Sequence, residues 1–179
     1  MSGKFTFNKR VYEYVDAVGN QTRVNERRME LPIAFEFVGR HKDVLEVGNV
    51  TRHYHREFTH PVIDLYEQSK WPIWNEDVLT FNPPKRYEAV VSISTVEHTI
   101  DALTAIKRIT EFASTYLITT PFGYKTTENI IDLDLPTYFM KRVNDDNDWI
   151  QVEKEDARGS QYNHPFPFAN CVAVITNEK

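Results

Sequence analysis

Short apolar runs separated by polar or turn-forming residues recur along the chain. Each run spans four to eight residues that are mostly apolar or β-branched, and several end beside a glycine or a proline. Near-continuous apolar strands of this length are typical of a mainly parallel sheet that is covered by helices on both faces. The runs predict strands at residues 44–47, 62–65, 87–94, 116–120, 149–152 and 171–175.

Several segments between these strands have a helical spacing instead. Apolar residues three or four positions apart predict a helix over residues 100–113, with Thr99 as its N-cap. A second helix is predicted over residues 25–38 and ends at Gly39. Strands that alternate with helices indicate an α/β fold with a doubly wound, mostly parallel, Rossmann-like sheet. Shorter helices are expected at residues 51–58 and 135–143.

The connection after the second predicted strand is short. Only seven residues separate Leu65 from Ile73, whereas a parallel crossover that contains a helix needs about a dozen. We therefore expect reduced helices in this second crossover and a thinly covered sheet face beside it. Trp71 and Trp74 are expected to cover that face, or alternatively to form a subunit contact in a homodimer.

The composition is that of an ordinary globular domain. The 179 residues carry a net charge of −5 and include 41% hydrophobic and 13% aromatic residues. Mild acidity argues against nucleic-acid and anionic-membrane partners. No apolar segment forms a signal peptide or reaches the roughly 18–20 residues of a membrane span, so a cytoplasmic location is expected. The lone cysteine, Cys171, lies in an apolar run and is expected to be buried.

We expect this chain to form one domain over residues 1–179. Within it, residues 1–38 are predicted to be an N-terminal helical extension that packs on the sheet or covers the site. Residues 40–176 are predicted to form the Rossmann-like core, because the strand-like runs and the helix between 100 and 113 all fall there.

Polar residues gather directly after the predicted strands. In doubly wound sheets, ligands bind at the carboxyl ends of the strands. Polar groups at successive strand ends therefore predict a ligand site along this edge of the sheet. The chain places there residues 46–50, Asp64, residues 75–78, residues 94–98 and residues 121–124.

The first of these segments lacks the features of phosphate-binding loops. A dinucleotide fingerprint that begins at Gly48 would need glycine where the chain has Val50 and His53, and no P-loop is present in the sequence. A ligand without phosphate relaxes these demands. S-adenosylmethionine is such a ligand, and it needs an acid for its ribose diol, a polar partner for its adenine amine and a tight turn for its amino-acid tail.

The ordered set of segments resembles the class I S-adenosylmethionine-dependent methyltransferases, and in particular a small bacterial or phage-type group. The resemblance covers roughly residues 25–176. It implies a Rossmann-like methyltransferase fold, S-adenosyl-L-methionine as cofactor and enzymatic methyl transfer. The matching segments are the V-L-E-V-G-N run at 44–49 and residues 62–67, 75–78, 87–98 and 162–170.

The resemblance implies cofactor-binding roles at the first two strand ends. Glu46 and Gly48 match the acid and the tight turn that sit under the methionine part of the cofactor. Asp64 matches the acid that holds the ribose hydroxyls, with Glu67 as the competing candidate.

The chain departs from the family pattern at Val50, where a second glycine is usual. A β-branched residue crowds such a turn. Asn49 tolerates a left-handed backbone, so we expect it to supply the permissive position and to count among the cofactor-binding residues.

The resemblance also implies roles at the next two strand ends. Asp77 matches the acid beside the adenine amine, and Val78 offers backbone and packing to the ring. Ser94 and Thr95 match the segment that lines the tail of the cofactor.

His98 is the candidate catalytic residue, in a Glu97–His98 pair that the resemblance also contains. A histidine can act as a general base near neutral pH and take a proton from an acceptor. Alternatively, His98 caps or braces the helix that follows it. A dedicated base is not obligatory, because positioning of the acceptor can supply most of the rate.

Two other groups of residues allow more than one interpretation. His53, His55 and His60 suggest a metal, but residues two apart do not share a face of a helix, so we expect no metal site. A further group of aromatic residues lines either an acceptor pocket or the core: Tyr124, Tyr138, Phe139 and Tyr162.

The sequence leads to the hypothesis of an S-adenosylmethionine-dependent methyltransferase that acts on a small-molecule or sugar-containing acceptor. The alternative is a degenerate, non-catalytic binding domain with the same fold. A nicotinamide-dependent oxidoreductase is disfavoured by the two glycines that are missing at positions 50 and 53.

Overall fold

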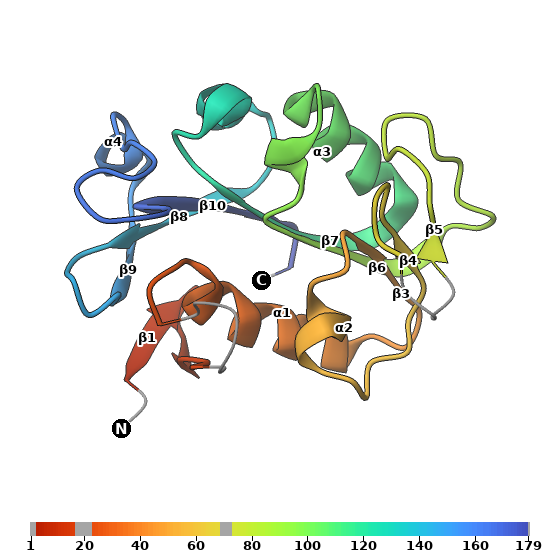
Figure 1. Cartoon of the computed structure of the whole chain (residues 1–179), viewed down its shortest axis with the longest axis horizontal. Helices are drawn as coiled ribbons and strands as arrows, with labels where there is room; N and C mark the ends of the chain where they lie inside the picture. The colour runs from red at the N-terminus through yellow and green to blue at the C-terminus, as the bar shows by residue number, and fades with distance from the viewer. Residues whose placement is uncertain (1–2, 17–22, 69–72, 179) are drawn as a thin grey trace.

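The computed structural model describes residues 3–16, 23–68 and 73–178. Among these residues the chain forms one large sheet and a separate two-stranded hairpin (Figure 1). From one edge of the large sheet to the other, the strands are β5 (Ile73–Trp74), β4 (Val62–Ile63), β3 (Val44–Val47), β6 (Tyr87–Ile93), β7 (Ala113–Pro121), β10 (Cys171–Thr176), β8 (Thr137–Arg142) and β9 (Trp149–Val152).

The sheet has a parallel half and an antiparallel half. Strands β5, β4, β3, β6 and β7 are parallel to one another. Strand β10 runs antiparallel to both β7 and β8, and β8 runs antiparallel to β9. The predicted α/β fold with a mostly parallel sheet is confirmed, and every predicted strand overlaps an observed one. Because the parallel strands share a direction, their carboxyl ends meet along one edge.

Helices cover both faces of the sheet (Figure 1). On one face lie α1 (Arg27–Arg40), α2 (Thr51–Tyr54) and the hairpin, and on the other lie α3 (Ala102–Phe112) and the 3₁₀ helix η2 (Lys125–Asp132). Two short helices complete the described residues, η1 (Val96–His98) and α4 (Lys154–Ala157).

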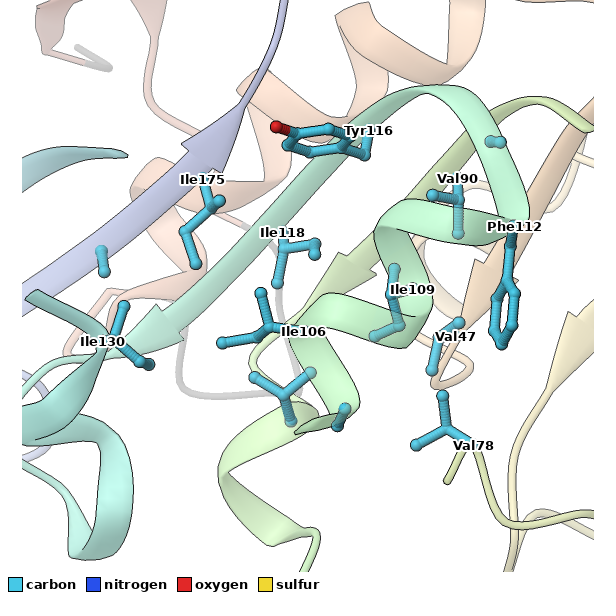
Figure 2. Packing of buried hydrophobic residues seen from close by; sticks show 14 of the residues in the cluster. Val47, Val78, Val90, Ile106, Ile109, Phe112, Tyr116, Ile118, Ile130 and Ile175 are labelled. Atoms are coloured by element: carbon cyan, nitrogen blue, oxygen red, sulfur yellow. The ribbon is translucent and has the colours of Figure 1, made fainter. Parts of the chain in front are cut away.

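Successive side chains of the central strands belong alternately to two separate hydrophobic cores, one on each face of the sheet. In β6, Val90 belongs to the core under α3, whereas Val91 belongs to the core under α1. In Figure 2, Ile106 and Ile109 of α3 lie against the sheet beside Ile118 of β7. This burial on both faces explains why the strands are near-continuous apolar runs.

The predicted helix over residues 100–113 is confirmed as α3, with a different cap. The side chain of Asp101, not Thr99, accepts a hydrogen bond from the Thr104 backbone N–H at 3.0 Å. The hydroxyl of Thr99 instead donates to the carbonyl of Val96 at 2.7 Å and closes η1. Asp101 is the first residue whose side chain points at the free N–H groups of the helix.

The helix predicted over residues 25–38 is confirmed as α1, although Pro32 lies within it. A proline removes the hydrogen bond to the carbonyl four residues earlier, which here belongs to Arg28. That carbonyl accepts a hydrogen bond from the backbone N–H of Val15 at 3.1 Å instead. The segment before the helix therefore replaces the bond that Pro32 cannot make.

The prediction of a helical extension over residues 1–38 is wrong for its first part. Strands β1 (Lys4–Phe7) and β2 (Arg10–Glu13) form an antiparallel hairpin whose turn residues, Asn8 and Lys9, have positive φ. Apolar Phe5 and Phe7 are buried and alternate with exposed residues. This alternation is typical of a half-buried strand and could have predicted the hairpin.

The helix predicted over residues 135–143 is also wrong, because Thr137–Arg142 forms β8 between β10 and β9. Phe139 and Met140 are adjacent and belong to opposite cores, as neighbours in a strand do. The short helix predicted over residues 51–58 is present only as α2.

The second crossover has little helical structure, as expected. Described residues 64–68 and 75–86 form no helix. Trp74 packs on the core under α3, with its ring centroid 5.5 Å from that of Phe81. Trp71 lies outside the described residues, and the homodimer stays a prediction.

Cys171 is fully buried, as predicted, and burial raises the pKa of its thiol to about 12. Among the described residues, no helix is both long and apolar enough to span a bilayer.

Candidate functional site

A cavity of about 580 Å³ opens at the carboxyl ends of the parallel strands. It is called the strand-end cavity here. The lining comes from the end of β3 (Val47 and Gly48), the end of β4 and its loop (residues 63–66) and residues 76–78 after β5. The connection after β6 supplies Thr95, His98, Thr99 and Ile100. The structure thus brings together most of the predicted site residues: Gly48, Asp64, Asp77, Val78, Thr95 and His98.

Gly48 is required by the backbone of this site. Its φ is +82°, and a Cβ atom there would overlap the Thr95 hydroxyl and lie 2.8 Å from Thr95 Cγ2. The backbone after β3 and the side chain after β6 therefore touch, and only glycine fits between them.

The permissive position of this turn is Gly48, so the expectation of a left-handed backbone at Asn49 is wrong. Asn49 is absent from the described residues with positive φ. Val50 has φ −104° and ψ −58°, which is right-handed helical backbone that any residue adopts. The turn therefore makes no demand for a second glycine at position 50, and Val50 packs partly on the core under α1.

Asp64 joins two strand-end loops. One carboxylate oxygen accepts hydrogen bonds from the backbone N–H groups of Tyr66 and Glu67, both at 2.9 Å, and the other accepts from Asn49 N–H at 3.2 Å. The side chain is half-buried. The same carboxylate thus shapes the loop after β4 and faces the cavity.

Asp77 holds the next loop in a similar way. Its carboxylate accepts a hydrogen bond from Leu79 N–H at 2.9 Å, and its carbonyl accepts from the N–H groups of Thr80 and Phe81. Val78 is buried in the core under α3 and presents part of its surface to the cavity.

Glu46 lies behind the cavity and does not line it. Its carboxylate is fully buried and accepts hydrogen bonds from Val50 N–H at 2.9 Å, Thr51 hydroxyl at 2.9 Å and His60 Nε2 at 2.8 Å. Glu46 therefore fixes the loop that carries Gly48. His60, considered above for a metal, has this structural partner, and the described residues contain no cluster of His, Cys, Asp and Glu suited to a metal.

Asn49 follows Gly48 in the chain but is not among the residues that line the cavity, and its side chain carries an unused acceptor. Its side-chain oxygen is buried and finds no hydrogen-bond donor in the described part of the chain. A buried acceptor in this state costs roughly 1–3 kcal/mol until a donor reaches it.

A second cavity, of about 90 Å³, adjoins the first along the same edge of the sheet. It is called the acid-lined cavity here. His98 lines both cavities, and Ser94, predicted as a cofactor residue, lines only this one. The hydroxyl of Ser94 donates to Glu30 at 2.7 Å. The other lining residues are Glu26, Arg27, Glu97, Pro121, Tyr124 and Tyr162.

Sequence reasoning located the acid-lined cavity only in part. Tyr124 and Tyr162 line it, whereas Tyr138 and Phe139 line a different hollow beside β8 and β9. Glu26 was not singled out, since an acid at the start of a helix is ordinary. No pattern in a single sequence shows that this acid meets a strand end about 70 residues away.

Burial dominates the electrostatics of the acid-lined cavity. The side chain of Glu97 is 3% exposed, and burial raises its pKa to about 8, although the Thr120 hydroxyl donates to it at 3.1 Å. Burial and the nearby Glu30 raise the pKa of Glu26 as well. Burial also raises the pKa of Tyr162 to about 12. His98 is exposed, and its Nε2 lies 3.8 Å from Glu97 Oε1.

Comparison with known proteins identifies the fold. No protein-family model and no curated protein matches the sequence. Among solved structures, the N-methyltransferase NodS from Bradyrhizobium japonicum WM9, in complex with S-adenosyl-L-homocysteine, matches with a TM-score of 0.51 and 12% identity over 86% of this chain and 88% of that chain. Magnesium protoporphyrin IX methyltransferase from Synechocystis PCC 6803, with bound S-adenosylmethionine, matches with a TM-score of 0.50 and 9% identity over 82% of this chain and 77% of that chain.

This chain has the fold of the class I S-adenosylmethionine-dependent methyltransferases.

In this methyltransferase fold the two cavities occupy different parts of the same edge of the sheet. The strand-end cavity lies over β3, β4 and β5, where the backbone turns and two half-buried aspartates face it. The acid-lined cavity lies over the ends of β6 and β7, and His98 lines it as well. A molecule in one would therefore lie next to a molecule in the other.

Proposed function

We propose that this chain binds S-adenosyl-L-methionine in the strand-end cavity and transfers its methyl group to a small-molecule acceptor. One observation carries the proposal, namely that Gly48, Asp64 and Asp77, from three successive strand ends, line the same cavity. The cavity volume of about 580 Å³ lies within the range of roughly 300–1,000 Å³ that small-molecule sites occupy.

The residues present fit the parts of this cofactor. Asp64 would accept hydrogen bonds from the ribose hydroxyls, and Asp77 from the adenine amine beside Val78. The tight turn at Gly48 leaves room that any Cβ atom would fill. The unsatisfied side-chain oxygen of Asn49 would suit the amino group of the methionine part.

Two of the predicted cofactor residues would act indirectly. Glu46 would hold the Gly48 loop through its hydrogen bonds with Val50, Thr51 and His60 rather than touch the ligand. Ser94 would support the wall between the cavities through Glu30, while Thr95 would face the cofactor directly.

The cofactor would supply an activated methyl group on a sulfonium, and the chain would supply position and proton handling. His98 lines both cavities, so its ring would stand beside the acceptor. Its Nε2 would take a proton from the acceptor and pass it to solvent, because the side chain is 65% exposed. Alignment of the acceptor atom with the methyl carbon would supply much of the rate.

The polar lining of the acid-lined cavity supports a polar acceptor. A sugar-containing acceptor rests on the family resemblance alone. We further propose that the chain acts in the cytoplasm without nucleic-acid or membrane partners, as its mild acidity suggests.

The proposal is tested by titrating S-adenosylmethionine and S-adenosylhomocysteine into the purified chain in a calorimeter. We expect micromolar binding of both, weakened at least tenfold in Asp64→Ala. The matched control is Asp43→Ala, which removes an aspartate whose partner is Lys85, 2.6 Å away, outside the strand-end cavity. No binding to the folded wild-type chain would overturn the proposal.

The non-catalytic alternative makes a different prediction, which is cofactor binding without methyl transfer to any acceptor. Its motives in the sequence were Val50 in place of a glycine, the short second crossover and the absence of an assured base. The ordinary backbone at Val50 removes the first of these, and methyl transfer is the function we favour.

A further inference from the structure

We infer that the acid-lined cavity receives an amino group of the acceptor, so that the atom methylated is a nitrogen. The inference rests on the proposed function, because it names the class of acceptor for the same site. It follows from the charges, the aromatic rings and the position of this cavity.

The charges in the acid-lined cavity are unbalanced. Three buried glutamates, Glu26, Glu30 and Glu97, lie in or directly behind its wall with one guanidinium, that of Arg27. Arg27 forms its ion pair with Glu30 at 3.0 Å. Glu30 is satisfied further by the hydroxyls of Ser94 and Thr119, each at 2.7 Å.

Glu26 and Glu97 have no lysine or arginine partner within ion-pair distance among the described residues. Glu97 accepts the hydroxyl of Thr120, and Glu26 accepts the N–H of Ala169 at 3.3 Å. The guanidinium of Arg27 acts on both carboxylates and that of Arg142 acts on Glu26, each from beyond ion-pair distance, and His98 Nε2 lies 3.8 Å from Glu97. Buried carboxylates with so few partners become neutral or bind a cation, because burial disfavours an isolated charge.

Two aromatic residues, Tyr124 and Tyr162, also line the cavity. The rings of Tyr124 and Tyr162 lie with their centroids 4.7 Å apart, and the ring of His98 lies 6.1 Å from that of Tyr124. The face of an aromatic ring attracts a cation and repels an anion. A wall of carboxylates and rings therefore selects an ammonium group over a carboxylate or a phosphate.

The size of the cavity fits one small group. Its volume of about 90 Å³ exceeds the roughly 10–15 Å³ that a single water needs, so a few non-hydrogen atoms fit. The rest of the acceptor would extend past His98 toward the strand-end cavity, where the methyl group of the bound cofactor would lie.

The proposed methyl transfer to nitrogen needs only the acceptor, the cofactor and the side chains of the site. The acceptor enters as an ammonium, R–NH₃⁺, held by the carboxylate of Glu97, and one of its protons passes to Nε2 of His98. The nitrogen lone pair then forms a bond to the methyl carbon, while the electrons of the breaking carbon–sulfur bond stay on sulfur. The products are the neutral thioether and R–NH₂–CH₃⁺, and the proton on His98 leaves to solvent.

The test compares three probes of matched shape, namely butylamine, butanol and butyrate. Each is titrated at pH 7.5 into the chain saturated with S-adenosylhomocysteine, and binding is measured by calorimetry. We expect butylamine to bind at least tenfold more tightly than the other two. Equal binding of butanol and butylamine, or tighter binding of butyrate, would overturn the inference.

Glu97→Gln tests the carboxylate itself. We expect this variant to weaken butylamine at least tenfold and to leave the affinity for S-adenosylhomocysteine unchanged. The matched control is Glu111→Gln, at an exposed position of α3, which should alter neither. Unchanged butylamine binding in folded Glu97→Gln would contradict the inference.

A measurement on the wild-type chain covers the case in which Glu97→Gln does not fold. Below pH 8, binding of the ammonium should release close to one proton from the cavity, because the bound cation favours ionised Glu97. Titrations in buffers of different ionisation enthalpy count that proton. Release of no proton between pH 6 and pH 7.5 would contradict the inference.

The two proposals fail separately. Binding of S-adenosylhomocysteine without selectivity for the amine refutes the nitrogen acceptor and leaves methyl transfer standing. Selective binding of the amine by a chain that does not bind S-adenosylhomocysteine refutes methyl transfer and retains the cationic preference of the cavity.

Discussion

The two cavities lie side by side on one edge of the sheet, yet they are built in different ways. The strand-end cavity is formed by the residues that directly follow β3, β4 and β5, with their carboxylates half-buried and tied to neighbouring backbone N–H groups. The acid-lined cavity is formed by side chains from α1, η1 and two distant loops, and two of its carboxylates are almost fully buried. The first cavity depends mainly on local backbone shape, and the second depends on the charge balance of the assembled fold.

This contrast predicts that backbone changes affect the first cavity and charge changes affect the second. The largest expected effect is that of Gly48→Ala. A methyl group at φ +82° would overlap Thr95, so we expect binding of S-adenosylmethionine to weaken at least 100-fold, about 2.7 kcal/mol. Calorimetry measures this loss.

The control is Gly39→Ala, near the end of α1, where an added Cβ meets nothing within 4 Å. That variant should bind the cofactor normally and gain roughly 0.5–1 kcal/mol of stability, because alanine is the better helix former. Normal binding by Gly48→Ala would show that the turn does not shape the cavity.

A different kind of effect, on stability rather than on cofactor binding, is expected for Glu97→Gln. The folded pKa of Glu97 is about 8, above the ordinary value of 4.5, so the folded state holds the proton more tightly. The stability of the wild-type chain should therefore fall as pH rises from about 4.5 to 8, and this dependence should disappear in the variant.

Melting temperatures at intervals between pH 5 and pH 8.5 check this prediction. The difference in melting temperature, variant minus wild type, should become steadily more positive over that range. A constant difference would mean that burial of Glu97 does not shift its titration.

Asp77→Asn should produce a moderate loss in the first cavity. The amide oxygen can still accept from Leu79 N–H, as the carboxylate does, so the loop should persist. One charge-assisted hydrogen bond to the ligand would be replaced by a neutral one, which predicts about tenfold weaker binding of S-adenosylmethionine. Unaltered affinity would remove Asp77 from the site.

The smallest effect is expected for Val50→Gly, which restores the glycine of the family pattern. Since Val50 already has right-handed backbone, the cofactor affinity should stay within about twofold. Stability should fall by roughly 0.5–1 kcal/mol, because glycine loses more entropy on folding. A variant that binds at least tenfold more tightly would show that Val50 restricts the cavity.

The sequence by itself determined the parts of this protein that have a local cause. Near-continuous apolar runs fixed the central strands, since a strand covered on both faces must be apolar throughout. Gly48 directly follows such a run and Asp64 lies near the end of the next, whereas Asp77 was found through the family resemblance. The parallel direction of the strands then places these residues on one edge.

The hydrophobic pattern was ambiguous where a short segment fits both the helical spacing of three to four residues and the strand spacing of two. Residues 137–142 were predicted to be helical, yet they pair with β10 and β9. The pairing partners, which are remote in sequence, made the choice that the local spacing could not make. Pro32 likewise stays inside α1 because Val15, from another segment, bonds the carbonyl that the proline leaves free.

Only the tertiary structure decided the contents of the acid-lined cavity. Glu26 and Glu97 are ordinary in sequence, one before a helix and the other after a strand. Packing of α1 beneath the sheet and of η1 above its edge brings both to one cavity and excludes water from them. Because burial sets the charge preference of a carboxylate, this property of the protein arises only when the chain is folded.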